Sequence, residues 1–294
     1  MKREHEFYTV QQIRQRLSMS TLVFWQYRPI GEDSLSDLVR HGITQIELVE
    51  SPEQFDMADM RSMKNIGEIC RSCGIQIAAF HAHSTNFSCV DTDAKRIARV
   101  DRCRRQIDSM LELGGRLWGS HATVMDEALL KSYEELARHI DGTDAAIAIE
   151  NFQQEQFWVE NRLAFLDRIG HPQVGMILDV GHVRNSAGIN PMTVVGGPTR
   201  VLEMCSRHLR WVHLHGFKDG KDHYPPFADG DDMQWVEVFQ MLRKIGYTAN
   251  FNFEPRGEPL HHDAVKATAL APERIADLEA RTHAKLPGSM DNSS

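Results

Sequence analysis

Four short apolar segments of the sequence each lead directly into an acidic residue or a histidine. The residues at these four positions are Glu150, Asp179, His213 and Glu254. Apolar runs of this length, bounded by turn signals, are typical of buried strands. A carboxylate or an imidazole at the end of such a strand is costly to bury without a partner. Because all four residues occupy strand ends, we expect these ends to converge on a metal ion.

Short apolar runs and amphipathic segments alternate along nearly the whole chain. Strands are predicted over 20–25, 44–49, 75–80, 116–120, 145–149, 174–178, 209–214 and 249–253. Helices are predicted over 31–42, 57–74, 94–114, 127–140, 161–170, 198–208, 233–245 and 262–280, several of them ending on glycine. Eight strands alternating with eight helices predict an α/β fold, a single parallel (β/α)8 TIM barrel. The barrel is expected over residues 1–285 with a polar N-terminal lead, and 286–294 are expected to form a disordered tail.

An open, doubly wound sheet is the alternative fold. Such sheets often carry a GxGxxG loop after a strand, and no predicted strand of this chain is followed by one. The polar strand ends also run from the third predicted strand to the eighth, which favours a closed barrel. Active sites of such barrels lie at the carboxyl ends of the strands, where the four residues are found.

Composition and charge exclude several classes of protein. No apolar run approaches the roughly 20 residues that span a bilayer, and the charged N-terminus is unlike a secretory signal. Five cysteines indicate a reducing, cytoplasmic setting. Cys70 and Cys73 have redox or zinc spacing but no second pair, so we interpret them as helix residues, one of them buried. The net charge of −8 disfavours an extended nucleic-acid surface, although not a small anionic substrate.

The four residues at the strand ends form a mixed set of three carboxylates and one imidazole. Mainly oxygen ligands with one nitrogen suit Mn²⁺ or Mg²⁺, while Co²⁺ and Zn²⁺ are also compatible. A divalent cation nearly neutralises the −3 charge of this set and leaves room for a hydroxy-carbonyl group. The cation would polarise the carbonyl and stabilise an enediolate as the neighbouring proton leaves.

Two of the carboxylates are placed to exchange protons with a substrate. Glu150 and Glu254 follow the fifth and eighth predicted strands, on opposite sides of an eight-stranded circle. A substrate between them would be deprotonated by one and reprotonated by the other. The alternative is that each carboxylate pairs with an arginine or caps a helix.

Several motifs together carry a resemblance to a known family. They are IEN at 149–151, LDVGH at 178–182, VHLH at 212–215, the loop motifs DGKDH and PPxxxG, and FEPR at 253–256. In this order the chain resembles the xylose isomerase-like barrels, the sugar-phosphate isomerase/epimerase group that includes tagatose and psicose 3-epimerases and inosose-processing enzymes.

The resemblance implies a metal-dependent isomerase or epimerase of a small ketose or related keto-sugar. It implies one divalent metal on Glu150, Asp179, His213 and Glu254, with the two glutamates as the acid/base pair and His182 in contact with the substrate. A keto-inositol or keto-sugar dehydratase shares the first half-reaction and stays an alternative. Members of the family often form dimers or tetramers.

The same superfamily contains AP endonucleases with three zinc ions, whose extra ligands are histidines and a D-x-H motif. This chain offers comparable residues in His83, His121, His182 and the pair Asp222 and His223. Two features weigh against a nuclease: Asp222 and His223 are adjacent rather than spaced by one residue, and the chain is acidic. A sugar pocket would use the same histidines to bind hydroxyl groups.

Three further positions leave alternatives open. His81 and His83 are two residues apart, and we expect one, His83, to point into the barrel mouth and the other away. His215 shares a strand face with His213 and is an alternative ligand. Arg256 either binds a phosphate or carboxylate or pairs with a neighbouring glutamate. The predicted substrate-binding residues are therefore His83, His121, His182, His215, Asp222, His223 and Arg256.

Overall fold

Eight parallel strands close into a barrel, as predicted. The structure, a computed structural model, describes residues 7–82, 92–122, 124–151, 159–257 and 263–284. Around the barrel the strands follow the order β1-β10-β7-β6-β5-β4-β3-β2. Their bounds are β1 Leu17–Ser20, β2 Gln45–Val49, β3 Gln76–Ala82, β4 Leu117–Ser120, β5 Ala146–Glu150, β6 Val174–Asp179, β7 Leu209–Leu214 and β10 Phe251–Phe253.

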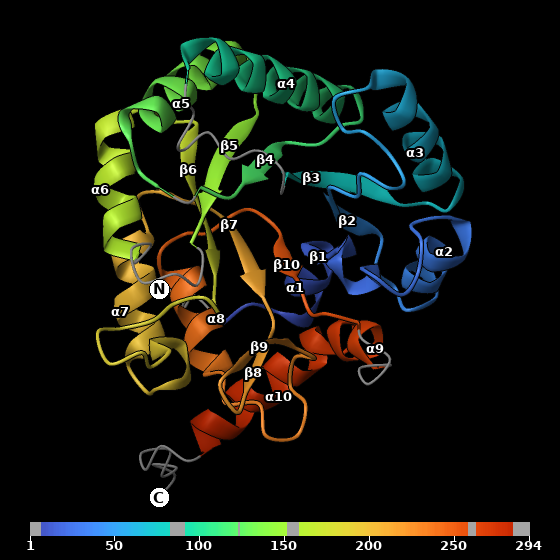
Figure 1. Cartoon of the computed structure of the whole chain (residues 1–294). Coiled ribbons are helices and arrows are strands. Elements are labelled where there is room, and N and C mark those ends of the chain that lie inside the picture. Colours follow the sequence, from blue (N-terminus) through green and yellow to red (C-terminus); the bar gives the residue numbers. More distant parts are fainter. Residues whose placement is uncertain (1–6, 83–91, 123, 152–158, 258–262, 285–294) are drawn as a thin grey trace, which may run out of the picture.

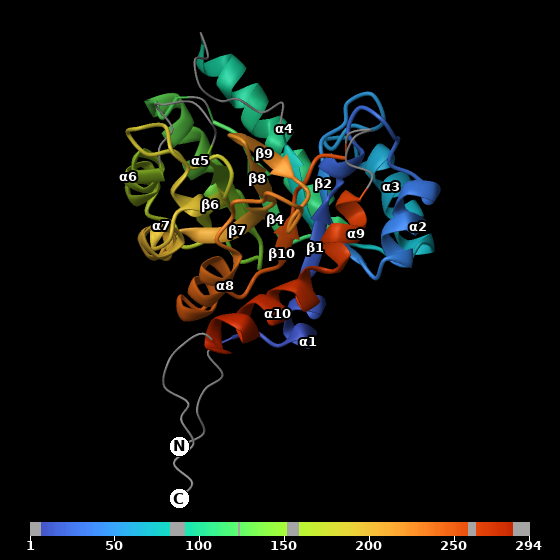
Figure 2. The same ribbon diagram turned by 90° about the horizontal axis from the view of Figure 1, so that it is seen from below.

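Helices surround the barrel and cover its outer face (Figure 1). They are α1 Val10–Gln15, α2 Glu32–Arg40, α3 Met60–Ser72, α4 Asp93–Glu112, α5 Glu127–Ile140, α6 Val159–Ile169, α7 Gly197–Cys205, α8 Trp235–Lys244, α9 Ala264–Ala269 and α10 Ala271–Ala284. The first and last of these lie side by side (Figures 1 and 2), and Arg14 of α1 forms an ion pair with Glu273 of α10. This contact joins the two ends of the described chain.

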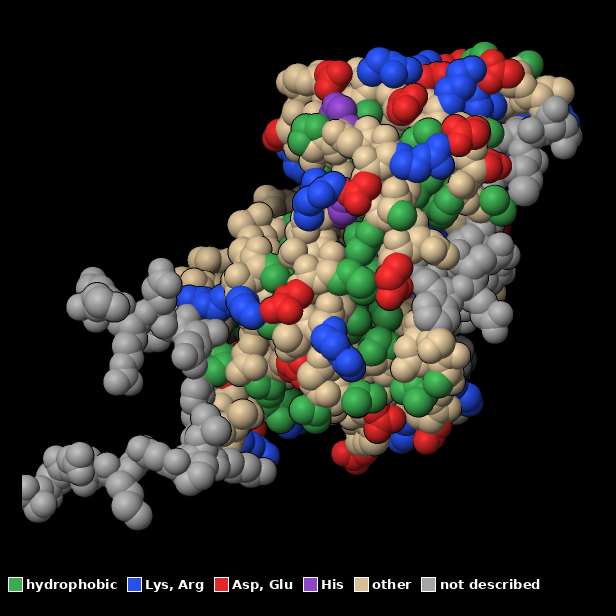
Figure 3. All heavy atoms as spheres, turned by 90° about the vertical axis from the view of Figure 1, so that its left-hand side faces the viewer, with side chains coloured by type: hydrophobic (Ala, Val, Ile, Leu, Met, Phe, Trp, Pro, Cys, Tyr) green, Lys and Arg blue, Asp and Glu red, His purple; other side chains and the backbone are tan. Residues whose placement is uncertain are grey.

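Charged side chains of both signs lie on one outer face of the molecule (Figure 3). In Figure 3, acidic and basic side chains are interspersed over the face that carries α6 and α7. None of the helices in the described ranges is long and apolar enough to span a membrane. Cys70 is buried within α3 and Cys73 caps the end of that helix, in agreement with their interpretation as helix residues.

The first strand was predicted wrongly. The apolar run at 21–24 forms a 3₁₀ turn, and β1 lies immediately before it at Leu17–Ser20. The Ser20 hydroxyl accepts a hydrogen bond from the Leu22 amide and so caps the turn. Ser18 and Ser20 bond Asn252 and Glu254 across the neighbouring strand. A strand with polar inward side chains lacks the apolar signal that we used to predict strands.

Three other segments contain structure that the sequence did not indicate. The N-terminal lead holds α1, and the expected last helix is divided into α9 and α10. The polar loop after β7 contains an antiparallel hairpin of β8 Gly216–Lys218 and β9 Lys221–Tyr224. This hairpin carries Asp222 and His223 back towards the mouth of the barrel. Residues 285–294, predicted to form a disordered tail, lie outside the described residues.

The barrel interior is layered from one end to the other. Near the amino ends of the strands, Ala79, Leu117, Ala148, Ile177 and Trp211 form a small apolar cluster separate from the main core under the helices. Towards the carboxyl ends of the strands lies the cluster of acidic residues and histidines. Because alternate residues of a strand face the same way, Trp211 of β7 lies directly below His213.

Candidate metal centre

Glu150, Asp179, His213 and Glu254 come together at the carboxyl ends of the strands. Glu150 and Asp179 end β5 and β6, His213 lies in β7, and Glu254 follows β10 directly. All four are buried, and one ligand atom from each lies within 4.8 Å of the other three. Glu150 and Glu254 are three positions apart around the barrel and therefore not directly opposite, contrary to our expectation.

Asn151 fixes the ends of β5 and β6 relative to each other. Its side-chain amide donates to the Asp179 carbonyl at 2.9 Å, and its side-chain oxygen accepts from the Asp179 amide at 2.8 Å. The Asp179 carboxylate is fixed in turn, because its Oδ1 accepts from the amides of Gly181 and His182. The two hydrogen bonds made by Asn151 give the IEN motif a structural purpose: they position the next carboxylate of the cluster.

His213, rather than His215, faces the three carboxylates. Its Nδ1 lies 2.9 Å from Glu254, 3.6 Å from Glu150 and 3.9 Å from Asp179. His215 is turned to one side: its Nε2 lies 3.0 Å from Asp179 Oδ1, and its Nδ1 accepts from the His223 amide. The geometry therefore favours His213 as the nitrogen ligand of the four-residue set.

Glu47 of β2 is a site residue that sequence reasoning missed. It is fully buried, and its Oε1 lies 3.1 Å from His213 Nε2. Its Oε2 accepts from the Asn252 amide at 3.0 Å, and the Asn252 oxygen accepts from the Ser18 hydroxyl. A carboxylate on the outer nitrogen of a ligating histidine fixes its tautomer and orientation. The sequence feature that could have revealed Glu47 is its position between Ile46 and Leu48, in a strand buried on both faces.

We expect Glu47→Gln to weaken divalent metal binding by about 10- to 100-fold, because the amide removes the charge that holds the proton on His213 Nε2. The effect is measured by competition with a chelator of known affinity. Glu53→Gln, an exposed glutamate after the same strand, is the matched control and should bind metal as the wild type does. Equal affinities in the two variants would show that Glu47 does not act through His213.

One of three further groups of possible ligands combines Glu47 and His81 with His213 and Glu254, and the other two also adjoin the first group. His81 and His121 share Glu150 with it, and both Nε2 atoms lie about 3 Å from Glu150 Oε2, at 3.0 and 2.9 Å. His182 and His223 share Asp179 with it, and their Nε2 atoms are 3.2 Å apart. Asp222 Oδ2 lies 3.6 Å from His182 Nε2. The four groups share residues and form one continuous cluster across the barrel mouth.

The prediction for the His81 and His83 pair rested on a wrong premise. His81 points into the barrel, where its Nδ1 lies 3.6 Å from Glu254. Residues two apart on a strand share a face, so they are not expected to point in opposite directions. His83 lies outside the described residues.

Arg256 lies at the edge of the cluster. Its side chain is exposed, and its guanidinium carbon lies 5.0 Å from the centre of the Trp25 ring. Its backbone amide donates to the His223 carbonyl at 2.9 Å, which ties the loop after β10 to the hairpin. Phe24 and Trp118 are buried in the main core, whereas Trp25 is 45% exposed.

The buried charges shift each other's pKa values strongly. Burial lowers the pKa of His81, but the facing carboxylates of Glu150 and Glu254 outweigh this and raise it to about 10. Burial likewise opposes the effect of Asp179 and Glu150 on His182, whose pKa rises to about 9. Against the cost of burial, the neighbouring histidines hold the pKa values of Glu150 and Glu254 well below their usual range. The imidazoles thus balance the carboxylates with protons, which a cation bound here would displace.

Comparison with known proteins agrees with this architecture. The model of a family described as xylose isomerase-like TIM barrel matches residues 35–280. None of the functionally curated proteins matches the chain in sequence. D-psicose 3-epimerase from Clostridium cellulolyticum H10, in a structure with D-tagatose, gives a TM-score of 0.66 at 15% identity, over 90% of this chain and 98% of that one.

Two other solved structures show the same fold. 3-Keto-D-glucoside 4-epimerase from E. coli gives a TM-score of 0.68 at 13% identity, over 88% of this chain and 99% of that one. A xylose isomerase-like TIM barrel protein from Mycobacterium smegmatis, in complex with magnesium, gives a TM-score of 0.66 at 15% identity, over 93% of this chain and 99% of that one. At such low sequence identities, the comparisons show a shared fold alone. Since the family model covers most of the sequence, the chain belongs to the xylose isomerase-like TIM barrel family.

Proposed function

We propose that the chain is a metal-dependent isomerase or epimerase of a small ketose or related keto-sugar. The observation that carries the proposal is the buried set of Glu150, Asp179, His213 and Glu254 at the barrel mouth, with two glutamates approaching the same space from different strands. The similar folds of a D-psicose 3-epimerase and a 3-keto-D-glucoside 4-epimerase support this choice of substrate class.

The donor atoms fit one divalent cation. Three carboxylates and one imidazole, all within 4.8 Å of one another, form a mainly oxygen set that suits Mn²⁺ or Mg²⁺, with Co²⁺ and Zn²⁺ compatible. The magnesium complex of a protein with the same fold supports this proposal. When bound, the cation would supply Lewis acidity towards a substrate carbonyl.

The two glutamates then move the proton. Glu254 is oriented by the Ser20 hydroxyl, which donates to its Oε1 at 2.9 Å, and it takes the proton from the carbon next to the carbonyl. Glu150 is held between His121 and His182 and returns a proton to the substrate. Return to the opposite face of the same carbon gives an epimer, and return to the former carbonyl carbon gives an aldose–ketose isomer. His182, whose Nδ1 lies 3.0 Å from Glu150 Oε1, would contact a substrate hydroxyl.

A phosphodiesterase of the AP endonuclease type is the second candidate. The observation that favours it is the continuity of the four ligand groups, which share residues such as Glu150 and Asp179 and offer places for more than one ion. The acidic balance of the chain, with 41 acidic against 33 basic residues, weighs against a protein that grips DNA through several phosphates. A keto-sugar dehydratase differs from the first proposal only in expelling a β-hydroxyl group.

Proton exchange and metal counting together test these candidates. Mn²⁺-loaded protein is incubated in D₂O with a panel of ketoses and keto-inositols, and the products are examined by proton NMR and mass spectrometry. Deuterium next to the carbonyl in a new isomer, with one metal per chain, is the expected result. Deuterium with loss of water would identify the dehydratase. Three metals per chain, no exchange, and cleavage of abasic DNA would overturn the sugar proposal.

A further inference from the structure

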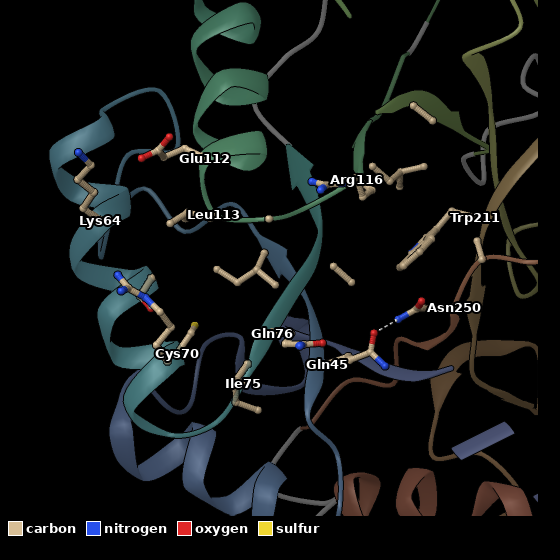
Figure 4. A pocket seen from close by; sticks show the side chains of 18 of the residues that line it. Gln45, Lys64, Cys70, Ile75, Gln76, Glu112, Leu113, Arg116, Trp211 and Asn250 are labelled. Atoms are coloured by element: carbon tan, nitrogen blue, oxygen red, sulfur yellow. Dashed lines mark hydrogen bonds between the residues drawn. The ribbon is translucent and has the colours of Figure 1, made fainter. Parts of the chain in front are cut away.

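A second cavity lies at the opposite end of the barrel, at the amino ends of the strands. It has a volume of about 830 Å³ and lies between the barrel and the C-terminal parts of α3 and α4 (Figure 4). Alanines line its floor at positions 78, 146 and 249, where larger side chains would fill the space. None of its lining residues belongs to the candidate metal centre.

Arg210 lines this cavity and lies at an irregularity in the sheet. In the pairing of β6 with β7, Met176 faces Leu209 and Ile177 faces Trp211, so Arg210 is an extra residue between two pairs. Bulges of this kind re-aim side chains at barrel rims. The arginine lies over Gly175, where an added Cβ would be 2.4 Å from Arg210 Cγ. A bulge and a glycine together therefore make room for this cation.

The charge of Arg210 lacks a carboxylate partner among the contacts that the structure gives it. Its terminal nitrogens donate to the carbonyls of Arg207, Leu209 and Pro172, the last at 2.7 Å. Burial lowers its pKa, yet a guanidinium keeps its proton under all ordinary conditions. A half-buried cation whose contacts are all neutral attracts an anion.

Trp211 supplies a second donor next to it in the chain. Its side chain points from β7 into the cavity (Figure 4) and is only 4% exposed. Within the described residues no acceptor lies in reach of its indole Nε1. Buried indole N–H groups usually have a hydrogen-bond partner, so this donor indicates a ligand atom that would accept from it.

The other side chains that line the cavity indicate the chemistry of the rest of the ligand. Ile77 and Leu117 are apolar, and the side-chain amide of Asn250 donates to the Gln45 side-chain oxygen at 2.9 Å (Figure 4). Glu68 and Glu112 lie on the helices at the other side of the cavity. The acidic side chains that line the cavity thus lie on its helical side, and the hydrogen-bond donors Arg210 and Trp211 of β7 lie on its barrel side.

We propose that this cavity binds a small carboxylate with an apolar body, held by the Arg210 guanidinium and the Trp211 indole N–H. The planar guanidinium matches the two oxygens of a carboxylate, and the apolar body lies against Ile77, Leu117 and the alanines. The proposal is independent of the proposed enzymatic function, because the two sites share no residue.

The test follows the indole resonances of ¹⁵N-tryptophan-labelled, metal-loaded protein during titration with benzoate. Trp211→Phe assigns the Trp211 peak. We expect benzoate to move this peak and neutral benzyl alcohol to leave it in place. Arg210→Met should weaken the apparent affinity at least about tenfold, as expected for a lost charged hydrogen bond. Arg207→Met, which removes a neighbouring surface arginine paired with Asp167, should leave it unchanged.

Three outcomes would overturn the proposal: an unmoved Trp211 peak at millimolar benzoate, equal effects of benzoate and benzyl alcohol, or an unchanged affinity in Arg210→Met. Inorganic phosphate that moves the peak when benzoate does not would also contradict it. If Arg210→Met does not fold, Arg210→Lys keeps the charge but loses the planar fork, and a several-fold weaker affinity is expected.

Discussion

Glu254→Gln is expected to lower kcat by about 10²- to 10⁴-fold, the usual contribution of a positioned general base. The substitution keeps the shape of the side chain, and an amide oxygen still accepts the hydrogen bond that the Ser20 hydroxyl donates to Glu254. What is lost is the basicity that, in the proposed reaction, removes the proton from carbon. The variant should therefore fold and take up metal and substrate, yet fail in turnover.

Exchange of substrate hydrogen with solvent separates this effect from slow product release. In D₂O the Glu254→Gln protein should incorporate almost no deuterium, even where the wild-type protein exchanges substrate without net conversion. Glu203→Gln, on the outer helix α7 and paired with Lys244, is the control and should behave as the wild type. Normal turnover in Glu254→Gln would eliminate Glu254 as the base.

The fold was predictable because its signals are local. Each strand and helix of a (β/α)8 barrel repeats one short pattern, and glycines such as Gly42, Gly74 and Gly114 follow α2, α3 and α4 with positive φ. The strand predicted before β2 was placed wrongly because β1 presents Ser18 and Ser20 to the barrel interior. A strand with this composition has the hydropathy of a loop, while the apolar residues after it pack outside.

The candidate site was predictable in part, for a related reason. Carboxylates at strand ends are visible in sequence because each follows an apolar run. Glu47 was missed, and His81 was expected to point away, because their roles depend on neighbours more than 100 residues away, His213 for the first and Glu254 for the second. The choice between His213 and His215 has the same origin, since strand periodicity cannot distinguish two residues on one face.

Asp179→Ala is expected to abolish stoichiometric metal binding at pH 7. The carboxylate is fully buried, its Oδ1 is held by two backbone amides, and its Oδ2 lies 3.9 Å from His213 Nδ1, on the side of the other ligands. Removing it takes away one of three charges in the set and one of its four donors. Asp179→Asn keeps an acceptor for the amides of Gly181 and His182 and so distinguishes metal loss from misfolding. Retained stoichiometric metal in a folded Asp179→Ala protein would show that the ligand set is wrong.

The wild-type protein should also release protons when metal binds at pH 7, and its affinity for metal should rise with pH. The direction of this pH dependence follows from the raised pKa values of three histidines. The pKa is about 10 for His81 and about 9 for His182, and that of His213 lies well above its usual value. Burial opposes each shift and the carboxylates dominate, so at pH 7 these imidazoles carry protons that a cation must displace. As the pH rises towards 9, fewer protons compete with the metal. Calorimetry in two buffers of different ionisation enthalpy measures the number released. A pH-independent affinity between pH 6 and 9, without proton release, would mean that the cation binds away from these imidazoles.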